Sequence, residues 1–187
     1  MASGGARPLL TLFTIGHGAD SAEHFVGRCR AAQVESIVDV RTAPGSRRHP
    51  HFGRDAMAQW LPDGGLAYRW EPQLGGFRKP RADSRNTGLR HPAFRGFADY
   101  METASFREAF DAVITEAGRR RTAAMCSETL WWRCHRRLIA DAAMLLCPVD
   151  VLHVDGRGRT SPHRLTDGVE RDNDHLRYVT AQSVLGL

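Results

Sequence analysis

Short apolar runs that are rich in β-forming residues alternate along this chain with longer segments of helical periodicity. The runs cover residues 9–15, 36–40, 66–70, 122–125 and 149–154. Strands that alternate with helices predict a parallel sheet with helices packed on both of its faces. The sequence therefore predicts an α/β fold with a mostly parallel sheet of about five strands.

The segments between these runs complete the predicted order of elements. Helical spacing follows Ser21 and Asp55 and returns over residues 97–121 and 131–146. Residues 71–95 combine prolines, glycines and basic residues, which predicts a long central loop of the kind that forms lids or binding segments. The polar tail predicts one short helix after Asp172. We expect a single domain over residues 1–187, with residues 1–8 and the C-terminal tail as its flexible parts.

Composition narrows the class of protein. The 187 residues are 42% hydrophobic, which is enough for a buried core. There is no apolar run of the roughly 18 to 20 residues that a membrane span needs, and the first residues lack the apolar core of a secretory signal. We therefore expect a cytoplasmic protein without a membrane partner, whose four cysteines are free thiols or metal ligands.

The formal charge of +5 is concentrated in arginine-rich clusters near residues 47–51, 78–90 and 119–121. Arginine side chains match carboxylates and phosphates, so a small anionic substrate or a nucleic acid is the expected partner. A solvated basic surface is the alternative reading of these clusters. It is favoured for residues 119–121, which follow a predicted helix and sit where positive charge stabilises the helix end.

Chemically reactive side chains follow the predicted strands. His17 comes after the first strand, Arg41 after the second, Cys126 and Glu128 after the fourth, and His153 at the end of the fifth. Ligands bind outside the carboxyl ends of the strands in open α/β sheets. The sequence therefore predicts a catalytic or anion-binding site at this edge of the sheet.

Two cysteines are candidate nucleophiles. Cys126 ends a strand, and Cys134 with His135 falls early in the predicted helix over residues 131–146, where the helix dipole and Arg136 favour a thiolate. The alternative for Cys134 is a structural role on the apolar stripe of that helix. His135 and His17 are the candidate general bases, with Glu128 assisting.

Cofactor motifs are absent from the sequence. It has no C-x-x-C, no G-x-G-x-x-G and no P-loop, so we expect no cofactor. Cys126, Cys134 and His135 are suitable metal ligands, with His17 or His153 to complete the set. Neighbouring residues on a helix point about 100° apart, which disfavours a shared ion, so a metal-binding protein is only an alternative.

Further residues are predicted to bind substrate. Ser46, Arg47 and Phe52 belong to a loop that mixes cations with an aromatic ring, a combination used for nucleotide binding. Tyr68 and the glycines Gly75 and Gly76 lie where the backbone can approach a ligand closely.

Several unusual motifs occur together in a characteristic order. They are Thr14-Ile15-Gly16-His17, Val38-Asp39-Val40-Arg41, Pro44-x-Ser46-Arg47, Leu74-Gly75-Gly76, Phe94 to Met101, Cys126-x-Glu128, Cys134-His135-Arg136 and Pro162-His163. With these motifs the chain resembles the DUF488 family of unknown function. The resemblance implies a compact α/β fold in bacterial or archaeal cytoplasm. It also groups His17, Arg41, Ser46, Arg47, Glu128, Cys134, His135 and Arg136 into one site.

The leading hypothesis is an enzyme that acts on a small anionic or nucleotide-like substrate. Arginines 41, 47 and 136 would hold the negative charge, and a cysteine would attack. A non-catalytic nucleic-acid-binding module that uses the Arg-rich loops is one alternative, and a Cys/His metal-binding protein is the other. Substrate, reaction, strand order and oligomeric state do not follow from the sequence.

Overall fold

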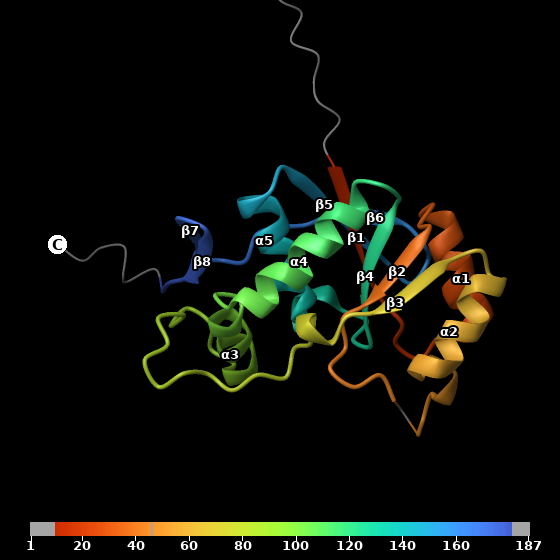
Figure 1. Ribbon diagram of the computed structural model, residues 1–187, viewed down its shortest axis with the longest axis horizontal. Coiled ribbons are helices and arrows are strands. Elements are labelled where there is room, and N and C mark those ends of the chain that lie inside the picture. The colour runs from red at the N-terminus through yellow and green to blue at the C-terminus, as the bar shows by residue number, and fades with distance from the viewer. Residues whose placement is uncertain (1–9, 46, 181–187) are drawn as a thin grey trace, which may run out of the picture.

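The computed structural model describes residues 10–45 and 47–180, and its centre is a six-stranded sheet (Figure 1). The strand order is β3-β2-β4-β1-β5-β6; β1 to β5 are parallel and β6 is antiparallel to β5. The predicted α/β class with a mostly parallel sheet is confirmed. The strands are β1 (Leu10–Gly16), β2 (Ser36–Asp39), β3 (Ala67–Trp70), β4 (Thr122–Cys126), β5 (Val149–Val154) and β6 (Thr160–Pro162).

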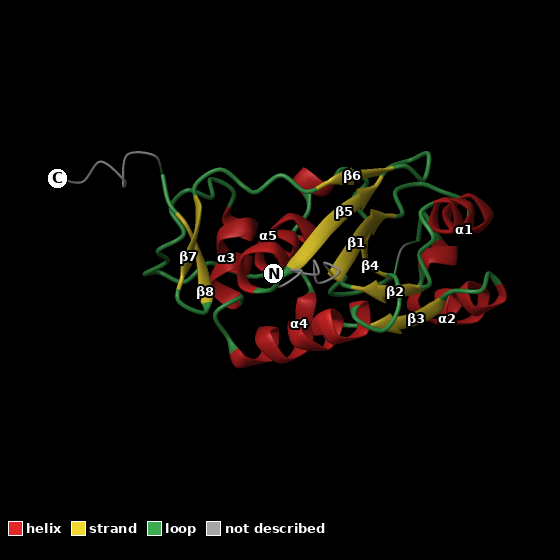
Figure 2. Ribbon diagram, turned by 90° about the horizontal axis from the view of Figure 1, so that it is seen from above, coloured by secondary structure: helices red, strands yellow, loops and turns green. Residues whose placement is uncertain are grey.

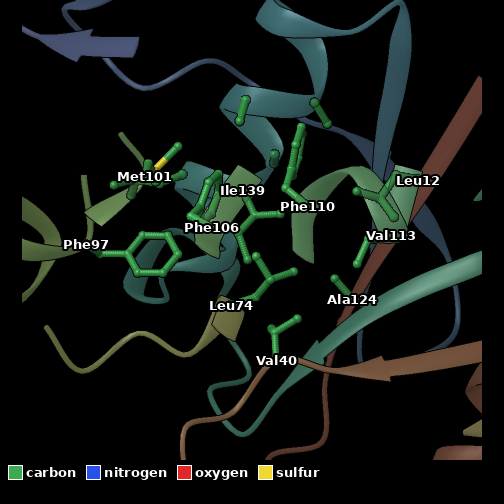
Figure 3. Close-up of a cluster of buried hydrophobic side chains, with 14 of the residues drawn as sticks. Leu12, Val40, Leu74, Phe97, Met101, Phe106, Phe110, Val113, Ala124 and Ile139 are labelled. Atoms are coloured by element: carbon green, nitrogen blue, oxygen red, sulfur yellow. The ribbon is translucent and has the colours of Figure 1, made fainter. Parts of the chain in front are cut away.

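Helices cover both faces of this sheet, as Figure 2 shows from above. Alternate residues of each strand point to opposite faces, so Phe13 and Ile15 pack with α1 and α2, whereas Leu12 and Ala124 pack with α4 and α5. Figure 3 shows the second of these two cores. The helices are α1 (Ala22–Ala31), α2 (Arg54–Asp63), α3 (Pro92–Tyr100), α4 (Ala104–Ala117) and α5 (Arg136–Leu146), with single turns η1 (Pro50–Phe52), η2 (Pro72–Leu74) and η3 (Trp131–Arg133).

Local sequence explains where several helices begin. The Ser21 side chain accepts a hydrogen bond from the backbone N–H of His24 at 3.1 Å, and Thr103 caps α4 in the same way. Such caps satisfy backbone donors that have no partner inside the helix. The cap predicted at Ser21 is therefore present.

The predicted helix over residues 131–146 is wrong in its first turn. Residues Trp131–Arg133 form the turn η3, Cys134 has an extended backbone (φ −124°, ψ 150°), and α5 begins only at Arg136 with His135 as its N-cap residue. The backbone N–H of Cys134 closes η3 by donating to the Trp131 carbonyl oxygen at 3.1 Å, which ends that turn before the helix starts. Cys134 is consequently not on the apolar stripe of α5.

The tail also differs from prediction. Instead of a helix after Asp172, the antiparallel strands β7 (Val169–Asp172) and β8 (His175–Tyr178) form a hairpin. Its turn uses Asn173 with a positive φ of 59°, a conformation that asparagine tolerates better than most residues. Leu176 and Tyr178 are buried against the core that contains α5, and this packing overrides the weak local signal. Residues 1–8, expected to be flexible, and 181–187 lie outside the described residues.

The long loop between η2 and α3 is tied down by one carboxylate. Asp99 on α3 is buried and accepts hydrogen bonds from the Arg81 backbone N–H, the Ser84 hydroxyl and the Asn86 amide at 2.6 to 2.8 Å. Gly96 lets the loop lie directly on the helix, since a Cβ there would collide with the Arg78 carbonyl oxygen. Among the described helices, none has the length and apolar character needed to cross a membrane.

Candidate active site

The carboxyl ends of β1 and β4 lie side by side at the point where the chain changes direction across the sheet. After β1 the chain enters α1, which belongs to one face, and after β4 it enters α5, which belongs to the other. Such switch points are where open α/β sheets bind ligands. His17 and Cys126 meet here, because the His17 backbone N–H donates to the Cys126 carbonyl oxygen at 3.0 Å.

One group of reactive side chains lies on the α4 and α5 side of this edge. Cys126, Cys134 and His135 are all buried, and their sulfur and ring-nitrogen atoms lie within 4.8 Å of one another. The sequence placed the two cysteines eight positions apart, and the extended backbone at Cys134 turns its sulfur toward the end of β4.

Hydrogen-bond geometry orients His135. Its Nε2 lies 3.0 Å from the Val40 carbonyl oxygen, which only accepts, so Nε2–H donates there. Nδ1 lies on the other side of the ring, 3.6 Å from the Cys134 sulfur. Gly76 borders the same atom, since a Cβ there would collide with Nδ1. The predicted close approach of backbone at Gly76 is therefore an approach to His135.

Cys134 carries the thiolate of this group. Burial raises its pKa, but the hydrogen bond with Cys126 and the charge of Arg136 outweigh burial and lower the pKa to about 6. The Nε of Arg136 donates to the Cys134 sulfur at 3.3 Å. Around neutral pH, Cys134 is therefore ionised and Cys126 is the neutral partner.

Cys126 behaves in the opposite way. Its hydrogen bond to Cys134 and its burial raise the pKa of the Cys126 thiol to about 12. A thiol held in its protonated form donates to the neighbouring thiolate and is a poor nucleophile. Of the two candidate cysteines, Cys134 is the one whose pKa is lowered.

A second group lies on the α1 and α2 side of the edge, around Arg41. Arg41 Nε and Nη2 donate to the two carboxylate oxygens of buried Asp39 at 2.8 and 2.6 Å, and Nη1 donates to His17 Nε2 at 3.1 Å. Because His17 Nδ1–H donates to the Gly18 carbonyl oxygen, both ring nitrogens are occupied. Burial, followed by the charge of Arg41, lowers the pKa of His17 to about 4. His17 is thus a neutral, anchored imidazole.

The predicted binding residues Phe52 and Tyr68 support this second group. Phe52 is fully buried and stacks on the His17 ring with centroids 4.0 Å apart. The Tyr68 hydroxyl donates to Asp39 at 3.0 Å, and burial followed by the Asp39 charge raises the pKa of Tyr68. Gly75 packs against Thr42, where a Cβ would collide with the threonine hydroxyl.

The remaining predicted site residues that the structure describes, Glu128 and Arg47, are exposed to solvent. Glu128 is exposed, and its carboxylate accepts from the Leu130 backbone N–H at 3.2 Å. Its contribution to the cysteine group is its backbone carbonyl oxygen, to which Arg136 Nη2 donates. Arg47 is exposed in the loop after β2, and Ser46 lies outside the described residues.

A buried polar chain beside the site escaped the sequence reasoning. The Thr14 hydroxyl lies 2.6 Å from His153 Nδ1, His153 Nε2 lies 2.9 Å from His163 Nδ1, and His163 Nε2 lies 2.9 Å from Asp141, which also accepts from the Tyr178 hydroxyl. His153 therefore does not join the cysteine group as a ligand. The signal that was available is Asp141, a carboxylate within the apolar stretch of α5.

Residues 21–143 match the family described as Domain of unknown function DUF488. The chain belongs to the DUF488 family. The match contains Arg41, both cysteines and His135, and it ends before β5 to β8. No curated protein and no solved structure matches this DUF488 chain.

Proposed function

We propose that this DUF488 protein is an enzyme that acts on a small anionic substrate through the Cys134 thiolate. The observation that carries the proposal is the environment of the Cys134 sulfur. It lies 3.6 Å from His135 Nδ1 and 3.3 Å from Arg136 Nε, with a protonated Cys126 beside it. A base and a cation within reach of a thiolate are the parts of a nucleophilic cysteine site.

Each residue has a distinct role in this proposal. The Cys134 sulfur forms a bond to an electrophilic centre of the substrate while the bond to the leaving group breaks. Water then attacks this intermediate, its proton passes to His135 Nδ1, and the thiolate is released. The Val40 carbonyl oxygen positions His135 by accepting from Nε2. Gly76 lets the backbone pack against the His135 ring and so helps to position it.

We assign Arg41 and Arg136 different roles, although the sequence suggested that both bind the anionic substrate. The guanidinium of Arg41 is satisfied by Asp39, His17 and Phe52, so it acts as a positioning residue. Within the described part of the chain no carboxylate lies within ion-pair distance of Arg136, so its charge favours both the thiolate and an approaching anion.

The ionisation of Cys134 tests this function directly. We expect the ultraviolet absorbance of thiolate to rise with a midpoint near pH 6 in the native protein, and the Cys134→Ser variant to lack this transition while Cys29→Ser keeps it. Cys29 is the matched control because burial raises its pKa to about 12. A midpoint above about pH 8, where unperturbed thiols ionise, would remove the proposal.

A metal centre is the second candidate, and one observation favours it. Cys126, Cys134 and His135 present three ligand atoms within 4.8 Å, and the sulfur to Nδ1 distance of 3.6 Å suits a tetrahedral Zn²⁺ site. The argument that adjacent helical residues diverge does not apply, because Cys134 precedes the helix. The Val40 carbonyl is the outer partner that a ligating histidine normally has.

Elemental analysis of freshly purified protein separates the two candidates. A metal centre predicts close to one equivalent of zinc that is lost in the Cys126→Ser variant and retained in Cys147→Ser. In that case the thiolate transition near pH 6 also appears only after removal of the metal with a chelator. Metal-free protein with the full thiolate transition supports the enzyme and rejects the metal centre.

A further inference from the structure

A large cavity opens beside the cysteine site, with a volume of about 760 Å³. We call it the Trp–Arg cavity, because Trp131, Trp132, Arg90, Arg137 and Arg164 line it. Its volume falls in the range of roughly 300–1,000 Å³ that is typical of small-molecule sites. Backbone hydrogen bonds connect it to the site, since Cys134 donates to the Trp131 carbonyl oxygen and accepts from the Arg137 N–H.

The cavity carries uncompensated positive charge. Its three arginines face a single carboxylate in the lining, Asp167, and within residues 10–45 and 47–180 none of the three forms an ion pair. Arg69, by contrast, forms ion pairs with Glu71 and Glu116. Arginines that converge on one cavity without carboxylate partners favour an anionic ligand.

Aromatic surface lies beside these charges. Three large hydrophobic side chains in the described residues are exposed, and two of them, Trp132 (49% exposed) and Leu165 (41% exposed), line this cavity. Trp131 is held in place by stacking on His153, with ring centroids 4.1 Å apart. Exposed rings next to arginines are the combination that stacks a base while binding its phosphate.

Two lining residues also contain buried polar atoms that lack a partner. Arg137 Nε and Thr166 Oγ1 are inaccessible to solvent and make no hydrogen bond. Unsatisfied buried donors cost roughly 1–3 kcal/mol each, and a ligand or a small rearrangement around one removes that cost. The Arg137 guanidinium is positioned over the Phe94 ring at 4.8 Å, which keeps it at the cavity wall.

We propose that the Trp–Arg cavity binds a nucleotide, with the base against Trp132 and the phosphate among Arg90, Arg137 and Arg164. The inference rests on the proposed function and deepens it, because it names the substrate class of the enzyme. The lining residues Trp131 and Arg137 are hydrogen-bonded to the backbone of Cys134. The volume of the cavity fits a free mononucleotide, and we assign the free nucleotide as the ligand.

Calorimetric titration of the full chain tests this assignment with nucleoside 5′-monophosphates and diphosphates. We expect saturable binding by at least one nucleotide, and at least tenfold weaker binding by the matching nucleoside and by inorganic phosphate. The Arg90→Gln/Arg164→Gln variant should weaken nucleotide binding at least tenfold. Both residues are exposed, so the protein should stay folded. Trp132→Leu should weaken binding as well.

The control for the loss of two positive charges is Arg119→Gln/Arg157→Gln, which removes two exposed arginines outside the cavity. This variant should bind the nucleotide with unchanged affinity. Equal weakening in both double variants overturns the proposal, and so does the absence of nucleotide binding to the native protein. Tighter binding of a single-stranded oligonucleotide that free mononucleotides cannot displace also overturns it.

The binding result is independent of the thiolate. If the native protein binds the nucleotide but shows no thiolate transition near pH 6, the nucleophilic enzyme is rejected and the cavity assignment stays intact; Cys134→Ser should then bind the nucleotide at native affinity. A normal thiolate transition without nucleotide binding rejects only the cavity assignment.

Discussion

At the scale of single residues, the arrangement around one sulfur atom decides the chemistry. Cys126 and Cys134 are both buried cysteines, yet the pKa of one is raised to about 12 and that of the other is lowered to about 6. Their mutual hydrogen bond separates the two values, because stabilising one thiolate requires the other sulfur to keep its proton. Arg136 sets the direction, since its Nε donates to Cys134.

Removing the thiol of Cys126, which donates to Cys134, should therefore change the pKa of Cys134. We expect Cys126→Ala to raise the pKa of Cys134 by about one unit, because a charge-assisted hydrogen bond is worth roughly 1.5–3 kcal/mol before solvent replaces it. Cys126→Ser retains a donor and should shift the pKa less. Titration of thiolate absorbance measures both, and equal values in Ala and Ser variants would contradict this account.

At the scale of elements, the long central loop depends on α3. Asp99 accepts three hydrogen bonds from the loop, so the loop is an ordered segment whose position is set by one carboxylate. The same loop carries Arg90 and leads into the Trp–Arg cavity. Its anchoring therefore matters for binding as well as for stability.

Loss of the Asp99 carboxylate should release this loop. We expect Asp99→Ala to speed tryptic cleavage after Arg81 and Arg85 on the order of tenfold, since local opening no longer breaks hydrogen bonds worth roughly 1.5–3 kcal/mol. Mass spectrometry of the first fragments measures this rate. Asp111→Ala, on the exposed surface of α4, is the control, and first cleavage elsewhere in Asp99→Ala would argue against the anchoring role.

At the scale of the whole molecule, two neutral histidines make folding sensitive to acid. Burial is the main cause that lowers the pKa of His17 to about 4 and that of His153 to about 3, from an ordinary value of 6.5. Below pH 6.5 these two histidines become protonated in the unfolded chain but stay neutral in the folded chain. The contribution of the two neutral histidines to the free energy of unfolding is therefore complete above pH 6.5 and is lost as the pH falls toward 4.

We expect the free energy of unfolding to decrease by up to about 1.4 kcal/mol per histidine for each pH unit below 6.5. Urea denaturation at pH 7.5 and pH 5.5 measures the change. His153→Gln should reduce the drop by about half, whereas His24→Gln, on an exposed helix face, should leave it unchanged. A drop of native size in His153→Gln would show that other groups are responsible.

Local patterns along the chain are sufficient to predict the class of fold and the edge of the sheet where the reactive residues gather. Alternating apolar runs and helical segments are local patterns, and parallel strands bring the residues that follow them to one edge. The sequence therefore predicts His17, Arg41 and Cys126 at this edge. The sequence did not predict the interruption of the helix at Cys134, because the segment around it fits a helical pattern. The extended backbone of Cys134 follows from the end of the turn η3.

The division of these residues into two groups follows from the three-dimensional fold. His17 stacks on Phe52 in the core that contains α1 and α2, whereas Cys126 and Cys134 belong to the core that contains α4 and α5. Partners such as His17 for Arg41 and Val40 for His135 depend on distances between segments far apart in the chain. Charge balance, pKa values and the Trp–Arg cavity follow from those distances, so no local pattern encodes them.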